Sequence, residues 1–314
     1  MISRRQFAAL SLGTGLAAVL PWQNVKAAKK SGGVVGFAQD QMANDWRAAQ
    51  VASVARALAA TAPDVTFLHT DARGSSAQQV LDIDSLLTTG IDVLITSPRD
   101  AAVVTPAISR THRAGVKVVL LTRRVTGEDY ATFIGPDDAA IALNAARALA
   151  ASLNGQGRIL VLQGVPSAST TLARTTGFLE ELENFPGLSV AATLPANYLR
   201  ADAIRAIETA LAGGLAFDAI YAQSDSMATG ARMALRKAGI NPATIPIVGI
   251  DYISEAREAI RGGEQVASFT YPNCGIEGAD AALRLLRGQP VEREVVVPSV
   301  MVTRHNVDAV DPIL

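Results

Sequence analysis

The sequence predicts an α/β protein with two domains, each a doubly wound, Rossmann-like parallel sheet covered by helices on both faces. Short apolar runs alternate with helical segments along almost the whole chain, as in sheets whose strands are joined by crossover helices. The chain has 314 residues, roughly two domains at ~150 residues each. Apolar residues make up 49% of it, which is enough for two sizeable cores.

The charge balance and the cysteine count exclude several classes of protein. Lys and Arg number 28 against 29 Asp and Glu, so nothing favours nucleic acid or an anionic membrane as partner. The one cysteine, Cys274, excludes an internal disulfide and a cysteine-rich metal cluster. We expect a structural thiol at this position, and neither a cofactor nor a metal in the protein.

The N-terminus is typical of an export signal over residues 1–27. Arg4 and Arg5 precede an apolar stretch of 13 residues at 8–20, shorter than the ~20 residues that a membrane-spanning helix needs. Small residues at positions 25 and 27 fit a cleavage site after Ala27. The paired arginines resemble the twin-arginine signal, with a general secretory signal as the alternative. Either route leads to the periplasm.

The first half of the mature chain predicts four strands, each followed by a helix. Apolar runs place the strands at 34–38, 65–69, 91–96 and 116–121. From Val51 onward, apolar residues recur with the spacing of one helix face. A second helix around Ile83 ends at Gly90, which suits a left-handed C-cap, and a third covers 101–114.

The pattern resumes after Gly135 and Pro136, where we expect the first crossover between the domains. A helix is predicted at 137–153, and further helices near 170–184, 201–212 and 226–238. The strands between them are expected at 158–162, 188–194, 217–222 and 245–250. Two sheets of five or six strands fit the length better than one large sheet.

Polar and aromatic side chains follow the ends of these strands. Ligands of doubly wound sheets bind beyond the carboxyl ends of the strands. Amides, carboxylates and guanidinium groups pair with hydroxyl groups, while aromatic faces cover C–H surfaces, so this set suits a neutral ligand rich in hydroxyls. The candidate ligand-binding residues are Gln39, Asn44, Trp46, Arg47, Ser97, Arg123, Tyr198, Ser224, Asp251 and, beside a later crossover, Tyr271.

Each candidate also has a simpler interpretation. Asn44 and Asp225 stand where helix N-caps belong. Trp46 suits surface or core packing, and Arg47 and Arg123 suit solvated charges.

Five groups of residues, in one order and without large gaps, resemble the periplasmic sugar-binding proteins of the ribose-binding type. They lie at 35–49, 162–164, 176–178, 221–228 and 247–251, and the resemblance covers about residues 33–303. The arrangement of Gln39 with Trp46 and Arg47 is most similar to the galactofuranose-binding branch.

This resemblance implies the type I periplasmic binding protein fold, in which two lobes joined by a three-strand hinge close on a sugar or polyol. A membrane permease of an ABC transporter then recognises the closed form. The crossovers are expected near Gly135, Thr270 and Val297. The first lobe would comprise 28–135 plus 272–297, the second 136–271 plus 298–314, and the protein would be a monomer.

The resemblance also implies roles for single residues. Asn44, Trp46 and Arg47 would clamp the ligand from the first lobe, with Trp46 stacked on the sugar ring. Arg123 matches the arginine after the fourth strand. Tyr198 falls where the second lobe offers an aromatic side chain, and Asp251 matches the hydroxyl-binding aspartate.

Four positions depart from the family pattern. Thr122 stands where an aspartate is usual, and Ser97 and Ser224 stand where asparagines are usual. Leu172 stands where ribose-type proteins have an arginine. The galactofuranose branch likewise has an apolar residue at this position. A polyol, a modified sugar and a non-sugar solute therefore all remain open as ligands.

Rival functions find little support in the sequence. There is no nucleophile elbow, phosphate loop or His-Glu-x-x-His, and the three histidines are far apart, so no enzyme is expected. A sugar-responsive repressor would need a DNA-binding segment where the export signal stands. Presentation of the ligand to a chemoreceptor or sensor kinase stays open, because both would recognise the closed lobes.

Overall fold

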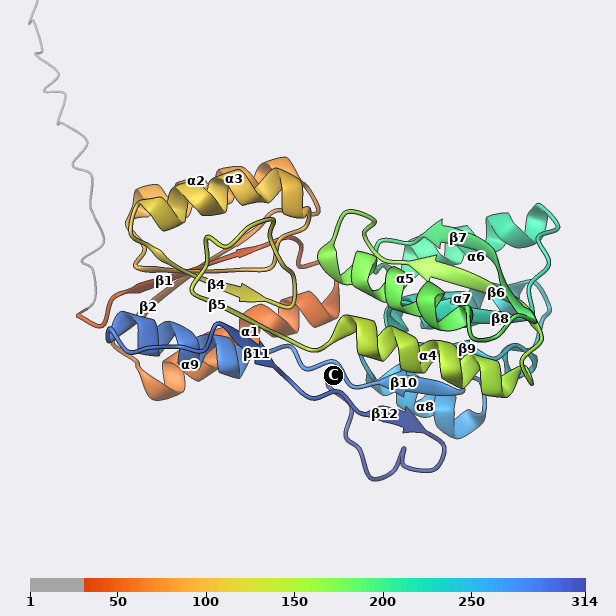
Figure 1. Cartoon of the computed structure of the whole chain (residues 1–314). Coiled ribbons are helices and arrows are strands. Elements are labelled where there is room, and N and C mark those ends of the chain that lie inside the picture. The colour runs from red at the N-terminus through yellow and green to blue at the C-terminus, as the bar shows by residue number, and fades with distance from the viewer. Residues whose placement is uncertain (1–30) are drawn as a thin grey trace, which may run out of the picture.

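The computed structural model describes residues 31–314, so the predicted export signal lies outside the described residues. The described chain forms two six-stranded sheets, each covered by helices on both faces (Figure 1). The predicted fold class is confirmed.

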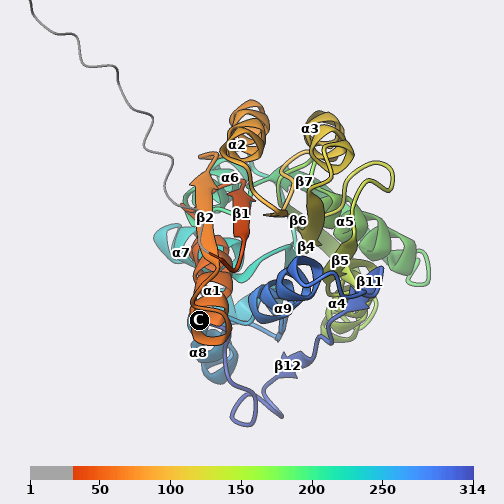
Figure 2. The same ribbon diagram turned by 90° about the vertical axis from the view of Figure 1, so that its left-hand side faces the viewer.

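The first sheet has the strand order β11-β5-β4-β3-β1-β2, with all pairs parallel. Its strands are β1 (Val34–Gln39), β2 (Thr66–Asp71), β3 (Val93–Thr96), β4 (Lys117–Leu121), β5 (Thr132–Gly135) and β11 (Glu294–Val296). One face carries α1 (Asp45–Thr61) and α9 (Gly275–Leu286), the other α2 (Ser76–Thr89) and α3 (Ala101–Arg113) (Figure 2). Successive residues of one strand, such as Val93 and Leu94 of β3, enter the cores on opposite faces of the sheet.

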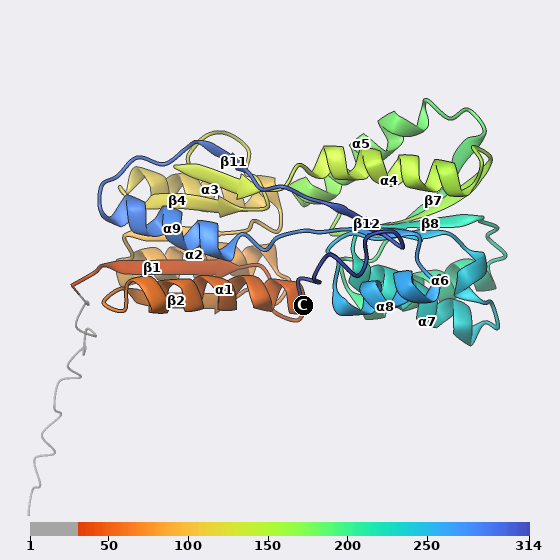
Figure 3. The ribbon, with the colours of Figure 1, turned by 90° about the horizontal axis from the view of Figure 1, so that it is seen from below.

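The second sheet has the order β12-β10-β9-β8-β6-β7. Its strands are β6 (Gly157–Gln163), β7 (Leu188–Pro195), β8 (Ala219–Ala222), β9 (Ile247–Val248), β10 (Ala267–Phe269) and β12 (Met301–Thr303). Among the described pairs only β10 with β12 is antiparallel. The helices α4 (Asp138–Ser152) and α5 (Ser169–Leu182) cover one face, and α6 (Arg200–Ala212), α7 (Asp225–Lys237) and α8 (Ser254–Gly262) lie on the other side (Figure 3).

The described chain passes between the two sheets in three places. These are the segments between β5 and α4, between β10 and α9, and between β11 and β12. We use "first lobe" for residues 31–135 plus 272–297, which contain the first sheet, and "second lobe" for 136–271 plus 298–314, which contain the second sheet. The carboxyl ends of strands in both lobes face the region between them (Figure 1).

Candidate functional site

The candidate site is a cavity between the lobes, where strand-end loops from both sheets meet. Each sheet reverses its strand order there, between β1 and β3 and between β6 and β8. The cavity encloses about 310 Å³ including its mouth. It is lined by Asn44, Trp46, Arg47, Thr170, Arg174, Tyr198, Asp251 and Tyr271.

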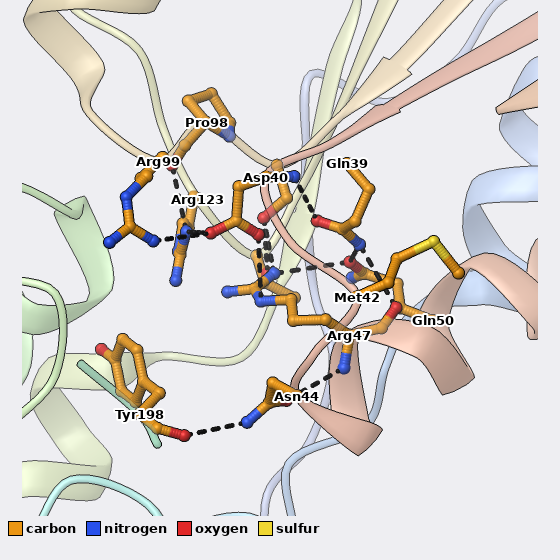
Figure 4. A network of polar contacts seen from close by, with 12 residues as sticks. Gln39, Asp40, Met42, Asn44, Arg47, Gln50, Pro98, Arg99, Arg123 and Tyr198 are labelled. Atoms are coloured by element: carbon orange, nitrogen blue, oxygen red, sulfur yellow. Dashed lines mark hydrogen bonds and ion pairs between the residues drawn. The ribbon is translucent and has the colours of Figure 1, made fainter. Parts of the chain in front are cut away.

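A buried carboxylate, Asp40, gathers three guanidinium groups on the first-lobe side. Its carboxylate lies 2.7 Å from Arg123, 3.6 Å from Arg47 and 3.7 Å from Arg99 (Figure 4). Burial alone would raise the pKa of Asp40, but the attraction of Arg123, Arg47 and Arg99 outweighs it and lowers the pKa. Asp40 is therefore held ionised, and it fixes the arginines that approach the cavity.

Arg47 reaches the cavity from the first turns of α1, held by hydroxyl and amide groups. Its Nη1 donates to Ser97 Oγ at 2.7 Å and to Thr122 Oγ1 at 3.4 Å. Gln39 donates from Nε2 to the backbone carbonyl of Arg47 and to Gln50 Oε1. Gln39 and Ser97 are thus not among the lining residues; they hold Arg47 in place.

Neither Arg47 nor Arg123 is a solvated charge, because both are buried. Arg123 pairs with Asp40 and lies with its Cζ 5.6 Å from the centre of the Tyr198 ring. It contacts residues of both lobes at the edge of the cavity, although it is not among the lining residues.

Asn44 and Trp46 link the first lobe to the second. Asn44 is the N-cap of α1, accepting from Arg47 N at 3.1 Å, and its Nδ2 also donates to the backbone carbonyl of Tyr198 at 3.0 Å. Trp46 Nε1 donates to the Tyr271 carbonyl at 3.0 Å, and the ring packs into the core of the second lobe. Asn44 is therefore a helix cap and Trp46 is a core residue, and both also line the cavity.

The second-lobe wall contains an ion pair that the sequence analysis missed. Arg174 Nε donates to Asp138 Oδ1 at 2.8 Å, and its Nη1 donates to the Gln223 carbonyl. Tyr271 donates from its hydroxyl to Asp138 Oδ2 at 3.3 Å, and Arg174 stacks over its ring at 4.4 Å. Burial would lower the pKa of Arg174, yet Asp138 and neighbouring groups raise it well above its ordinary value.

Asp251 faces the cavity, and no described residue forms a hydrogen bond with its carboxyl group. The loop that carries it is held by Asp225, which accepts from Tyr252 N at 2.7 Å and from Gln265 Nε2 at 2.7 Å. Ser224 is the N-cap of α7, accepting from Met227 N at 3.3 Å, and it is not among the lining residues. Asp225 follows this cap and supports the Asp251 loop.

Left-handed backbone conformations concentrate at this site. Among the described non-glycine residues with positive φ are Thr122, Tyr198, Asp251 and Tyr252, all in loops that follow strands at the cavity. Thr122, with φ 60°, is β-branched, and such residues rarely adopt this conformation. Unfavourable backbone geometry of this kind is typical of functional sites.

We expect the stability of the protein to depend on pH through Asp251. Burial raises its pKa to about 8; Arg174 and Arg47 oppose the shift, while Asp225 and Asp138 add to it. The folded protein therefore keeps a proton that the unfolded chain releases near pH 4. Its contribution to stability is complete below pH ~4 and is lost as the pH rises to about 8.

The measurement is the free energy of unfolding from pH 4 to 9 for the wild type and for Asp251→Asn, which cannot titrate. Asp225 and Asp138 titrate in both proteins, so the difference between the two isolates Asp251. Stability curves that run parallel from pH 4 to 8 would contradict the assignment.

Gly164 makes room for the Tyr198 ring. A Cβ at this position would lie 2.0 Å from Tyr198 Cζ. The Tyr198 hydroxyl forms hydrogen-bond contacts with Thr171 Oγ1 at 2.6 Å and Thr170 Oγ1 at 3.2 Å, so a displaced ring loses both. We expect Gly164→Ala to cost about 1–3 kcal/mol of stability and to weaken ligand binding.

Gly262→Ala is the matched control, because a Cβ there meets nothing within 4 Å. Chemical denaturation of both variants checks the prediction. Equal stability in the two would show that Tyr198 is not held by this contact.

Arg174 supplies the second-lobe arginine that the family pattern places at the position of Leu172. Leu172 is exposed, whereas Arg174, two residues further along α5, is buried at the cavity. The second-lobe wall thus contains an arginine after all. On the first-lobe side, Thr122 replaces the usual aspartate before Arg123. The carboxylate that pairs with Arg123 comes from Asp40 instead.

Other features of the described chain carry no chemistry of their own. In residues 31–314, no three His, Cys, Asp or Glu side chains lie together as a metal site. Cys274 is buried at the start of α9, and burial raises the pKa of its thiol. No helix in this part of the chain is both long and apolar enough to cross a bilayer.

Residues 35–290 match the family described as periplasmic binding protein domain. The chain belongs to this family. The periplasmic binding protein is 28% identical over 255 residues to the xylitol-binding protein of Mycolicibacterium smegmatis, covering 79% of this chain and 72% of the relative. It is 27% identical to the galactofuranose-binding protein YtfQ of Escherichia coli, covering 79% and 80%.

A solved structure extends the likeness to three dimensions. The fructose-binding periplasmic domain of a hybrid two-component system superposes with a TM-score of 0.83 at 27% identity, covering 88% of this chain and 92% of that one. The periplasmic binding protein described here thus has the type I fold that the sequence predicted.

Proposed function

We propose that the protein is the solute-binding component of an ABC importer, binding a sugar or polyol between its lobes and delivering it to the membrane permease. The observation that carries this is the cavity itself, which receives guanidinium, carboxyl, amide and aromatic groups from both lobes. Relatives named for binding xylitol and galactofuranose support the same ligand class.

The geometry suggests how binding and closure are coupled. Arginine N–H groups donate to ligand hydroxyls, Asp251 offers acceptor oxygens, and Trp46 and Tyr271 present ring surfaces to C–H groups. The lobes already touch through Asn44 Nδ2 with the Tyr198 carbonyl at 3.0 Å and Arg124 N with Ser169 Oγ at 2.8 Å. A ligand that contacts both walls adds to these bonds and stabilises the closed form, which the permease recognises.

The N-terminal signal supports export to the periplasm, with cleavage near Ala27 and with the twin-arginine route preferred. We expect the exported protein to be a monomer and to catalyse no reaction. Mass measurement of the mature N-terminus and of the native protein tests these points.

A thermal-shift screen against neutral sugars, polyols and amino acids tests the proposed function. A ligand at 100 times its Kd stabilises by about 2.7 kcal/mol, a rise in Tm of several degrees at ~2–4 °C per kcal/mol. A stereochemically selective sugar or polyol among the hits is the expected result. Hits confined to amino acids would overturn the proposed ligand class.

The fructose-binding structural neighbour belongs to a two-component system, which favours presentation to a sensor kinase as a second candidate function. The two candidates differ in the partner and not in the cleft. Loss of ligand uptake on deletion of the gene for this protein supports import. Unchanged uptake with a lost transcriptional response would support signalling.

A further inference from the structure

The first-lobe side of the cleft has an excess of buried positive charge. Asp40 is the carboxylate that faces Arg47, Arg99 and Arg123, and the side chains of Arg123 and Asp40 are fully buried. The second-lobe wall does not compensate for this excess, because Asp138 is already paired with Arg174 at 2.8 Å and burial raises the pKa of Asp251 to about 8, which keeps its carboxyl group largely neutral at pH 7. The electrostatic balance of the site therefore has room for one more negative charge beside Arg47 and Arg123.

Arg123 offers the geometry that such a charge requires. Its Nη1 is engaged with Asp40 and the Pro98 carbonyl, while Nε and Nη2 are buried without a hydrogen-bond partner among residues 31–314. These two nitrogens form one edge of the planar guanidinium group, a fork that matches the two oxygens of a carboxylate. Figure 4 shows Arg123 between Asp40 and the Tyr198 ring, which lines the cavity.

Arg47 lies close enough to be affected by the same charge. Burial lowers its pKa to about 10, and the like charge of Arg123 adds to the effect. An anion between Arg47 and Arg123 would offset the repulsion between them, whereas a neutral hydroxyl only accepts a hydrogen bond. Buried charges without a compensating partner are costly, so the charged ligand gains more.

We propose that the preferred solute is a sugar acid, an aldonate or uronate whose carboxylate pairs with Arg123 and Arg47 and whose hydroxyl groups face Asp251. This rests on the proposed function and specifies the ligand class of the same cleft. Asp251 suits the hydroxyl end because it lines the cavity on the second-lobe side and no described residue bonds its carboxyl group. The carboxylate end of the solute thus faces the first-lobe wall, and its hydroxyl end faces the second-lobe wall.

Isothermal titration calorimetry with matched pairs tests the proposal. The pairs are D-galactonate with galactitol, D-galacturonate with D-galactose, and D-xylonate with xylitol, all at one pH and ionic strength. In at least one pair the acid is expected to bind about tenfold or more tightly than its neutral partner, since bonds to charged groups are roughly twice as strong. Neutral partners that bind as well as or better than every acid overturn this inference and leave the proposed function standing. Binding of none of the six overturns this inference, and the thermal-shift screen then decides separately whether the proposed function stands.

Two variants locate the carboxylate. Arg123→Gln is expected to reduce the ratio of acid to neutral affinity to near one, and Arg123→Lys, which keeps the charge but not the fork, to reduce it in part. Arg110→Gln is the control, because Arg110 is an exposed arginine of the same lobe, paired with Asp84. Thermal melts confirm that each variant is folded. An unchanged ratio in folded Arg123→Lys and Arg123→Gln would place the carboxylate elsewhere and overturn the assignment.

Discussion

Replacing Asp251 with alanine is expected to lower the affinity for the solute by about a hundredfold or more. The carboxyl group lies at the cavity and has no hydrogen-bond partner in the described chain, so its oxygens are available to the ligand. A buried hydroxyl that loses its hydrogen-bond partner costs ~1–3 kcal/mol, so two such losses reach the ~2.8 kcal/mol that corresponds to a hundredfold change in affinity. Asp251→Asn keeps the shape of the side chain and is expected to lose less.

Calorimetry with the ligand found in the screen measures this effect. Asp308→Asn is the control, since Asp308 is an exposed carboxylate of the same lobe whose partner is Arg261. Wild-type affinity in a folded Asp251→Ala variant would remove Asp251 from the binding site and with it the orientation of the solute proposed above.

The second large effect concerns stability and arises at Asp40. Asp40→Ala leaves Arg47, Arg99 and Arg123 without the carboxylate that they share. Removing one partner of a buried ion pair costs ~3–5 kcal/mol, because the remaining charge is buried and uncompensated. This is a large part of a total stability of ~5–15 kcal/mol, so we expect a sharply lower midpoint of unfolding in urea.

Asp84→Ala provides the comparison for Asp40→Ala. Asp84 pairs with Arg110 at 2.8 Å, but both side chains are exposed to solvent. Exposed ion pairs contribute ~0–1 kcal/mol, so this variant should unfold close to the wild type. Equal destabilisation by the two substitutions would mean that the arginine cluster is less buried than the structure shows.

Much of the fold is predictable from the sequence because it has a simple physical cause. Strands buried on both faces, such as β1, β3 and β4, read as continuous apolar runs. The position of the site also follows, because loops after parallel strands converge at one edge of a sheet. The strands β10, β11 and β12 have three residues each and are too short to show a period.

The partners within the site are not predictable in this way. Asp40 and Arg123 are 83 residues apart, and only the strand order β4-β3-β1 brings them together. Arg174 was overlooked because the family pattern drew attention to Leu172. Two residues on a helix differ in direction by about 200°, so an exposed Leu172 places Arg174 toward the protein.

The first lobe is completed by a late part of the chain. Helix α9 packs against α1, and β11 joins the edge of the sheet beside β5, although residues 136–271 of the second lobe come before both in the chain (Figure 2). During synthesis, most strands of the second sheet are therefore made before α9, which covers the first sheet beside α1. Such non-local pairing is slow to form and leaves apolar surface exposed meanwhile. The first lobe thus depends on a helix and a strand that are made after five of the six strands of the second sheet.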